Sequence, residues 1–352
     1  MSECAVEELL DPIEFSSHQH QEGSPETLGR LTPDVSVVRK FFNREFRFPD
    51  GLDLEIWTFE DASGARGFPA PLTRAREDQV VHVKLEPGKK VHTIHHHGIE
   101  PEPRNDGVAH TSFEVTGSYT YQWRPEPGIA GDPNTGSAGT YFYHCHVNTV
   151  LHVQMGMFGP IVIDPKQQGR GTAFVDGPRY DLESETLWVP YSVDPRWHTL
   201  NHAAGLQGED VGLNRFEPTN FYVLGDNLDH PDTGDGVKAN VDVTVHLDRV
   251  ATTPTLVRIV NANYFPLTID FRDLDVEVIS HDGRPFRDLS GGPGSFCRPV
   301  RVATRRLHFG AAERYEVLLK PTRRGTFPVD FTWLHWIRER PIRTLTRTVT
   351  VV

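Results

Sequence analysis

Short runs of alternating apolar and polar residues, separated by turns rich in glycine and proline, constrain the fold of this chain most. One set of runs falls between residues 35 and 163, and a second falls between residues 186 and 352. The runs are rich in Val, Ile, Thr, Tyr and Phe, and no long helical pattern stands between them, which is typical of β-sandwiches and barrels. With 30 Gly and 27 Pro in 352 residues, the composition also fits many turns. We therefore expect an all-β protein.

The individual runs predict the strands. In the first half they are residues 35–38, 52–58, 80–85, 91–94, 119–123, 140–143 and 159–163. In the second half they are residues 186–190, 221–224, 241–247, 256–260, 267–271, 276–279, 315–319, 327–333 and 345–352.

The two halves of the chain have similar lengths and close in a similar way. The segments that begin at Gly139 and Gly325 both start with Gly-Thr-aromatic and lead through an aromatic-rich strand to a histidine. A polar stretch with several glycines follows residue 165 and is typical of a linker. We therefore predict two tandem β-sandwich domains. The expected bounds are a flexible tail at 1–33, domain 1 at 34–165, a linker at 166–185 and domain 2 at 186–352.

The charge and composition exclude several kinds of function. Because 36 Lys plus Arg stand against 48 Asp plus Glu, the formal charge is −12, and the chain lacks the basic surface that a nucleic-acid partner needs. Cys4, Cys145 and Cys297 are too few and too scattered for a disulfide framework. No apolar run reaches the ~20 residues that cross a bilayer, and residues 1–15 lack the pattern of a secretory signal. The sequence as given indicates a cytoplasmic protein without a membrane partner, although export of a longer precursor would leave the same sequence.

Histidines are frequent, with 18 in the chain, and they are clustered. The densest groups are His-Thr-Ile-His-His-His at residues 92–97 and His-Cys-His at residues 144–146. Because side chains alternate between the two faces of a strand, His95 and His97 share one face. By the same rule the two histidines that flank Cys145 share a face, and Cys145 points to the other. Four imidazoles can therefore converge on one side of the thiol.

The thiol can meet further soft ligands on its own face, because His152 and Met157 follow it closely. Two His, one Cys and a weak Met ligand form the set of a blue-copper electron-transfer site, whereas a structural zinc site would have no use for Met157. The histidines on either side of Cys145 would connect such a site to a second copper centre through one residue of covalent path. The sequence therefore predicts copper as the cofactor.

At these residues the sequence resembles the multicopper oxidases, and the resemblance covers nearly the whole chain after the tail. His95-His96-His97-Gly98 matches the family's His-x-His-Gly motif. His144-Cys145-His146, followed by His152 and Met157, is similar to the type 1 copper signature, with two more residues between Cys145 and His152 than usual. In the second half, residues 257–263, 279–285 and 313–315 resemble sequence segments that are typical of a later domain of the family. The resemblance implies two tandem cupredoxin-like Greek-key β-sandwich domains, with the copper motifs in domain 1.

The resemblance also implies a role for each matching residue. The type 1 copper site would consist of His92, Cys145, His152 and Met157. His95 would be a type 2 ligand, and the type 3 ligands would be His97, His144 and His146. Asp106 would donate protons near the centre that reduces oxygen.

Domain 2 departs from the pattern of the family. A complete trinuclear cluster needs more histidines than the four of domain 1, yet only His335 lies on the strand where a partner ligand is expected. The sequence also resembles copper nitrite reductases, whose second copper centre needs only three histidines. His97, His144 and His335 occupy the matching positions. However, that family has Asp where this chain has His95, and it lacks a counterpart of His146. Related two-domain proteins are trimers with copper between subunits. The resemblance therefore implies a homotrimer in which four domain 1 histidines and His335 of a neighbour form the second centre.

These features predict a laccase-like multicopper oxidase. Single electrons would pass from a small-molecule reductant through the type 1 copper to an interdomain copper centre that reduces dioxygen. One alternative is a copper nitrite reductase-like enzyme, which three rather than four converging histidines would favour. An alternative of another class is a copper-binding or electron-transfer protein without turnover.

Overall fold

The computed structural model describes residues 31–352 except residues 87, 89, 110–113, 116, 133–134, 202–214, 233, 240–241 and 289–298. Most of the predicted tail, together with Cys4 and Cys297, lies outside the described residues. Strands dominate the rest of the chain, which confirms the predicted all-β class. Within the described residues, the helical elements are the short helix α1 (Thr149–Met155) and the 3-10 turns η2 (Pro103–Asn105) and η3 (Trp197–Thr199).

The first half of the chain forms two four-stranded sheets. One has the order β2 (Asp53–Glu60), β1 (Val35–Arg47), β4 (Val81–Glu86) and β6 (Tyr119–Trp123). The other has the order β3 (Thr73–Arg76), β8 (Phe158–Asp164), β7 (Gly139–His144) and β5 (His95–His97). Apolar side chains of both sheets, such as Val83, Tyr121, Tyr143 and Ile161, pack into one buried core. The two sheets therefore form a sandwich.

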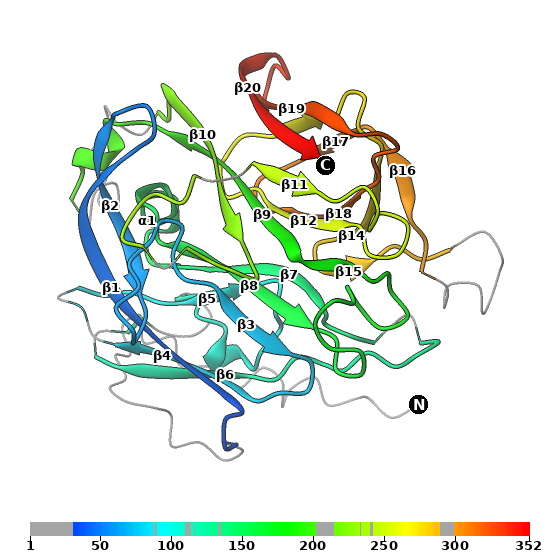
Figure 1. Ribbon diagram of the computed structural model, residues 1–352. Coiled ribbons are helices and arrows are strands. Elements are labelled where there is room, and N and C mark those ends of the chain that lie inside the picture. Colours follow the sequence, from blue (N-terminus) through cyan, green and yellow to red (C-terminus); the bar gives the residue numbers. More distant parts are fainter. Residues whose placement is uncertain are drawn as a thin grey trace, which may run out of the picture.

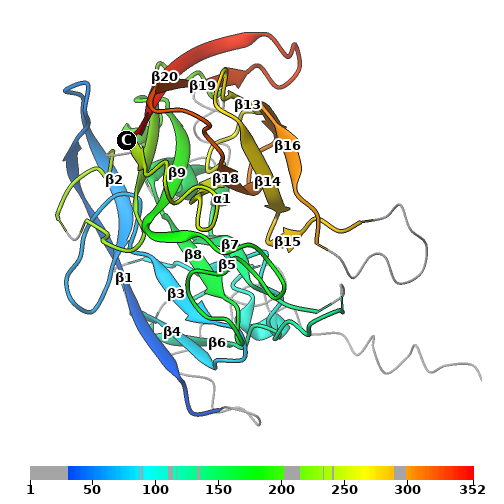
Figure 2. The same ribbon diagram turned by 45° about the vertical axis from the view of Figure 1, so that its right-hand side comes forward.

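The second half repeats this arrangement with two larger sheets. The seven-stranded sheet has the order β10 (Asn220–Asn227), β9 (Asp181–Val193), β12 (Thr255–Val260), β18 (Arg314–Leu319), β14 (Val276–His281) and β15 (Arg284–Pro285), and β16 (Val302–Thr304) pairs with β14. The five-stranded sheet has the order β11 (Val243–Val245), β20 (Pro341–Val351), β19 (Gly325–Leu334), β13 (Leu267–Asp270) and β17 (Arg306–Phe309). Residues of both sheets, including Trp188 and Phe331, share a second core. Figures 1 and 2 show this sandwich beside the first.

The two sandwiches pack directly against each other. Phe142 and Phe158 of the first and Tyr191 and Leu224 of the second belong to one buried cluster. Next to it, the Arg258 guanidinium lies 2.7 Å from Glu185 and also pairs with Glu316, and all three side chains are at most 1% exposed. Such a buried pair stabilises the fold only while both charges are present.

Arg74 ties the first sandwich into this network. Its guanidinium donates to Asp164 at 2.7 Å and to Glu185 at 2.9 Å. Although burial opposes ionisation, Arg258 and Arg74 hold the pKa of Glu185 below its usual range. The two sandwiches therefore share charged as well as apolar contacts.

The strands differ from the predicted runs at several points. Residues 91–94 do not form a strand: His92 makes an isolated bridge with Val115, and β5 starts at His95. The short strands β3, β15, β16 and β17 were not predicted. β9 begins at Asp181, inside the predicted linker at 166–185, and the predicted domain bounds stay predictions. None of the helices in the described part of the chain is long and apolar enough to cross a membrane.

Candidate metal centres

Cys145 lies at the centre of a first group of metal-binding side chains. It follows β7, and its Sγ is 3.2 Å from His152 Nδ1 and 3.8 Å from His92 Nδ1. One ligand atom of each residue lies within 4.8 Å of the other two, and all three side chains are buried. One thiol and two imidazole nitrogens thus face the same small space. The structure brings together three of the four residues that the resemblance assigns to a type 1 copper.

The turn and short helix that follow Cys145 place the His152 side chain next to the Cys145 thiol. Asn148 adopts a positive φ of 43° just before α1, and α1 ends at Gly156, whose φ is 111°. A Cβ at Gly156 would lie 2.9 Å from a main-chain carbonyl oxygen of β2, so this tight turn favours glycine. The Cys145 N–H then donates to the Met157 carbonyl at 3.0 Å. This bond places Met157, the fourth predicted ligand, next to Cys145 in the same buried core.

Two aromatic side chains of the β1–β2 hairpin cover the imidazoles of this group. Phe41 stacks on His92 with a centroid distance of 4.4 Å and an interplanar angle of 19°. Trp57 meets His152 edge-on at 5.5 Å, and its Nε1–H donates to Glu55 at 2.6 Å. An apolar shell of this kind limits solvent access to a metal and tunes its redox potential. Phe41 and Trp57 were not predicted from the sequence, because nothing in the motif spacing points to that hairpin.

Four other imidazoles gather where β5 and β7 pair. His95 lies opposite His144 in the register of the two strands. The His95 ring centroid is 5.5 Å from that of His97, 5.2 Å from that of His144 and 5.4 Å from that of His146. His95, His97 and His144 form a second group whose ligand atoms lie within 4.8 Å of one another. The alternation of side chains along the two strands therefore does bring four histidines together.

Hydrogen bonds orient the rings of this second group. His144 Nδ1–H donates to the carbonyl of the next residue at 3.0 Å, and His95 Nδ1–H donates to the Asp106 carbonyl at 2.8 Å. Both bonds leave Nε2 as the unprotonated nitrogen, which is how second-shell acceptors prepare a metal ligand. Burial and the nearby Arg314 charge lower the pKa of His97 to about 3, and burial lowers the pKa of His144 well below its usual value. Both rings are therefore neutral and able to bind a metal at neutral pH.

Asp106 lies against the second group with both its main chain and its side chain. Besides its carbonyl contact, its Oδ1 is 3.3 Å from His95 Nδ1, and the side chain is 25% exposed. The following residue, Gly107, has a φ of 75°, and a Cβ there would be 1.9 Å from the Ile94 carbonyl oxygen. Only glycine therefore allows the turn to approach β5 so closely. The carboxylate can exchange protons with solvent beside the imidazoles, and its role as a proton donor stays a prediction.

Known proteins that are similar to this chain include several copper-dependent oxidases. The sequence profile of the multicopper oxidases matches residues 64–168, a segment that contains both histidine groups. Copper resistance protein A of Pseudomonas syringae pv. tomato is 35% identical over 105 residues, which are 29% of this chain and 15% of that protein. Residues 64–168 of the chain are therefore similar to the multicopper oxidases. L-ascorbate oxidase of Cucumis sativus is 31% identical over 156 residues, which are 42% of this chain and 22% of that enzyme.

Solved structures of multicopper oxidases show the same fold. The blue copper oxidase from Nitrosomonas europaea superposes with a TM-score of 0.60 and 17% identity, over 94% of this chain and 86% of that one. A multicopper oxidase from Campylobacter jejuni gives a TM-score of 0.60 and 18% identity, over 95% of this chain and 62% of that one. The predicted pair of tandem cupredoxin-like sandwiches is thereby confirmed. The matched segments span only 15% and 22% of the two curated relatives described above.

Copper is the cofactor of multicopper oxidases, and the donors of both groups suit it. A thiolate with two imidazoles is a soft set that selects copper, and an all-imidazole group binds copper as well. Burial raises the pKa of the Cys145 thiol to about 11, so the thiol keeps its proton at neutral pH until a metal displaces it.

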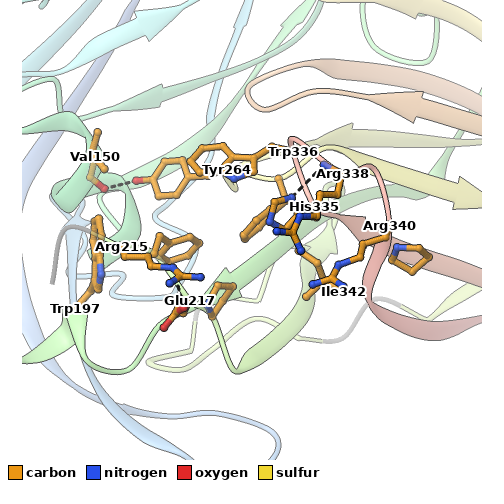
Figure 3. A pocket seen from close by; sticks show the side chains of 14 residues that line it. Val150, Trp197, Arg215, Glu217, Tyr264, His335, Trp336, Arg338, Arg340 and Ile342 are labelled. Carbon is orange, nitrogen blue, oxygen red and sulfur yellow. Dashed lines mark hydrogen bonds and ion pairs between the residues drawn. The ribbon is translucent and has the colours of Figure 1, made fainter. Parts of the chain in front are cut away.

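His335 lies apart from both groups of metal-binding side chains. It follows β19 and lines a groove with Tyr264 and Trp336, which Figure 3 shows from close by. Its Nδ1 accepts hydrogen bonds from the N–H groups of Ile337 and Arg338, both at 3.2 Å. The neutral ring therefore carries its proton on Nε2. Among the described residues His335 belongs to no group of three or more potential metal ligands, and its role as a ligand across a subunit interface stays a prediction.

Proposed function

We propose that this chain is a laccase-like copper oxidoreductase that takes single electrons from a small-molecule reductant and reduces dioxygen. The observation that carries the proposal is that two groups of metal-binding side chains include residues adjacent in the sequence. Cys145 belongs to the first group and its neighbour His144 to the second, and the ring of its other neighbour, His146, lies 5.4 Å from that of His95 in the second group. When bound, copper would supply the one-electron oxidation at the first group and the activation of oxygen at the second.

The residues of the chain would connect the two copper sites, keep water from the first site and supply protons to the second. The covalent path from Cys145 to either flanking imidazole crosses a single peptide bond. Phe41 and Trp57 keep water from the imidazoles of the first group. Reduction of dioxygen to water consumes protons as well as electrons, and the partly exposed Asp106 carboxylate beside His95 is placed to hold and deliver them.

The number of converging imidazoles favours dioxygen over nitrite as the acceptor. A nitrite-reductase-like centre would use two histidines of domain 1 and one from another subunit, with a carboxylate at position 95. This chain instead has the imidazole of His95 there, within 5.4 Å of His146. The relatives described above are likewise named as oxidases or copper resistance proteins.

The test compares two neighbouring histidines on opposite faces of β5. His97→Leu removes an imidazole of the second group, whereas His96→Leu alters a ring packed against Tyr121 and Trp123. After copper loading we expect the native chain and His96→Leu to consume oxygen with 2,6-dimethoxyphenol as reductant, and His97→Leu to lose this activity. Copper binding without oxygen uptake in the native chain would refute the oxidase and favour the non-catalytic copper protein.

The homotrimer is a separate part of this proposal. In it, His335 of one chain would complete the second group of its neighbour. The proton on His335 Nε2 weighs against this, because that nitrogen would have to coordinate the metal. Sedimentation of the copper-loaded chain measures the assembly, and His335→Gln should lower the copper content only if the ligand crosses the interface.

A further inference from the structure

A groove of about 1020 Å³ opens between α1 of the first sandwich and the β19–β20 hairpin of the second. Five aromatic side chains line it: Trp197, Phe216, Tyr264, Phe265 and Trp336. Figure 3 labels Trp197, Tyr264 and Trp336 among them. Phe216 contacts Trp197 at 5.4 Å, Tyr264 at 5.3 Å and Phe265 at 5.7 Å, and Phe265 contacts Trp336 at 6.0 Å. Trp336 is 57% exposed, so its ring is available to a ligand.

The charge of the groove is opposite to that of the whole chain. Three arginines, Arg215, Arg338 and Arg340, line it against one carboxylate, Glu217, in a chain whose net charge is −12. Glu217 is already engaged, because it accepts a hydrogen bond from Arg215 Nε at 2.9 Å and lies 3.6 Å from Arg196. Within the described part of the chain, no carboxylate pairs with Arg338 or Arg340. Two guanidinium groups therefore remain to pair with an anion.

His335 adds a neutral donor to this positive wall. Because its Nδ1 accepts two main-chain N–H bonds, its Nε2 carries the proton and can only donate. Figure 3 shows His335 and Arg215 on opposite sides of the groove. An anion held between them would meet donors from two walls.

We propose that this groove binds a planar aromatic anion, namely an aromatic carboxylate. Its ring would pack on the exposed Trp336 and the neighbouring aromatic side chains, where flat apolar surfaces bind best. Its carboxylate would pair with Arg338 or Arg340, whose planar guanidinium groups match carboxylates in two-point contacts. This inference goes beyond the oxidase proposal and uses no step of it.

The experiment measures binding to the copper-free full chain by isothermal titration calorimetry with three probes. We expect 4-hydroxybenzoate to bind, and the neutral 4-hydroxybenzamide and the non-aromatic cyclohexanecarboxylate each to bind roughly tenfold more weakly, since each lacks one of the two kinds of contact. Failure of 4-hydroxybenzoate to bind, or equal affinity for all three probes, would overturn the proposal.

Variants locate the site. Arg338→Gln and Arg340→Gln should each weaken 4-hydroxybenzoate roughly tenfold, whereas Arg305→Gln, which breaks an exposed pair with Asp275, should leave the affinity unchanged. Both groove arginines are exposed, so their substitution should not impair folding. Unchanged affinity in both groove variants would overturn the proposal. If the probe fails to bind but the groove variants change the sedimentation coefficient, the groove is instead an interface between copies of the chain.

Because binding is measured without copper, its outcome is independent of oxidase activity. If the copper-loaded chain also oxidises 4-hydroxybenzoate, and Arg338→Gln raises the KM without lowering kcat, the bound anion is a reductant. If it binds without being oxidised, the groove holds a non-reducing ligand, and the binding proposal stands in either case.

Discussion

His96, the middle residue of the three adjacent histidines, offers a quantitative test of the strand alternation. Its side chain is 1% exposed and packs against Tyr121 and Trp123. Burial, together with the charge of His95, lowers the pKa of His96 to about 3, from 6.5 in the unfolded chain. The unfolded chain therefore takes up a proton at His96 as the pH falls below 6.5, whereas the folded chain does not until about pH 3. Stability is full above pH 6.5 and is lost as the pH falls through this window.

The size of the effect follows from these two pKa values. Near pH 5 the free energy of unfolding should be about 2 kcal/mol lower than near pH 7.5 through His96 alone. His96→Leu, which keeps an apolar side chain of similar size, should remove this contribution. Urea titrations of the copper-free native chain and the variant near both pH values measure it. A pH-dependent difference between the two proteins below about 0.5 kcal/mol would refute the assignment of His96 to the core.

Three further substitutions test other parts of the account. Cys145→Ser should abolish the thiolate-to-copper absorption yet leave copper at the imidazole group, and a variant that stays blue would contradict the first group. Asp106→Asn keeps the carbonyl that orients His95, so copper content should hold while oxygen reduction slows about a hundredfold; an unchanged rate would remove Asp106 from proton transfer. Arg258→Met leaves the buried carboxylates of Glu185 and Glu316 without their cationic partner. The free energy of unfolding should fall by about 3 kcal/mol. A loss below about 1 kcal/mol would show that the two carboxylates are not both charged.

The sequence predicts the long strands well because they alternate in composition and end at strong turns. The run at residues 119–123 coincides with β6. Short strands escape such reasoning when their pattern is polar. In β3, Thr-Arg-Ala-Arg, Arg74 is ion-paired with Asp164 and Glu185, contacts that no local pattern reveals. His92 was expected within a strand, but it makes an isolated bridge to Val115, and its side chain lies 3.8 Å from Cys145 Sγ.

The candidate site was predictable where its residues are close in sequence. Once strands are assumed, the spacing of His95 and His97 predicts that their side chains share a face, and the same holds for the two histidines around Cys145. The structure places these side chains as predicted. Phe41 and Trp57 were not predictable, because they reach the imidazoles through tertiary packing of a distant hairpin. A strand position alone likewise could not reveal which nitrogen of His335 is engaged by the main chain.

The most direct test of the central claim is the copper content per chain after reconstitution, read together with the visible and EPR spectra. The account predicts more than one copper per chain. It also predicts an intense blue band from the Cys145 thiolate and a separate signal or near-ultraviolet band from the imidazole group. A single copper with the blue band alone would contradict the second group, and a colourless chain without copper would contradict the account as a whole.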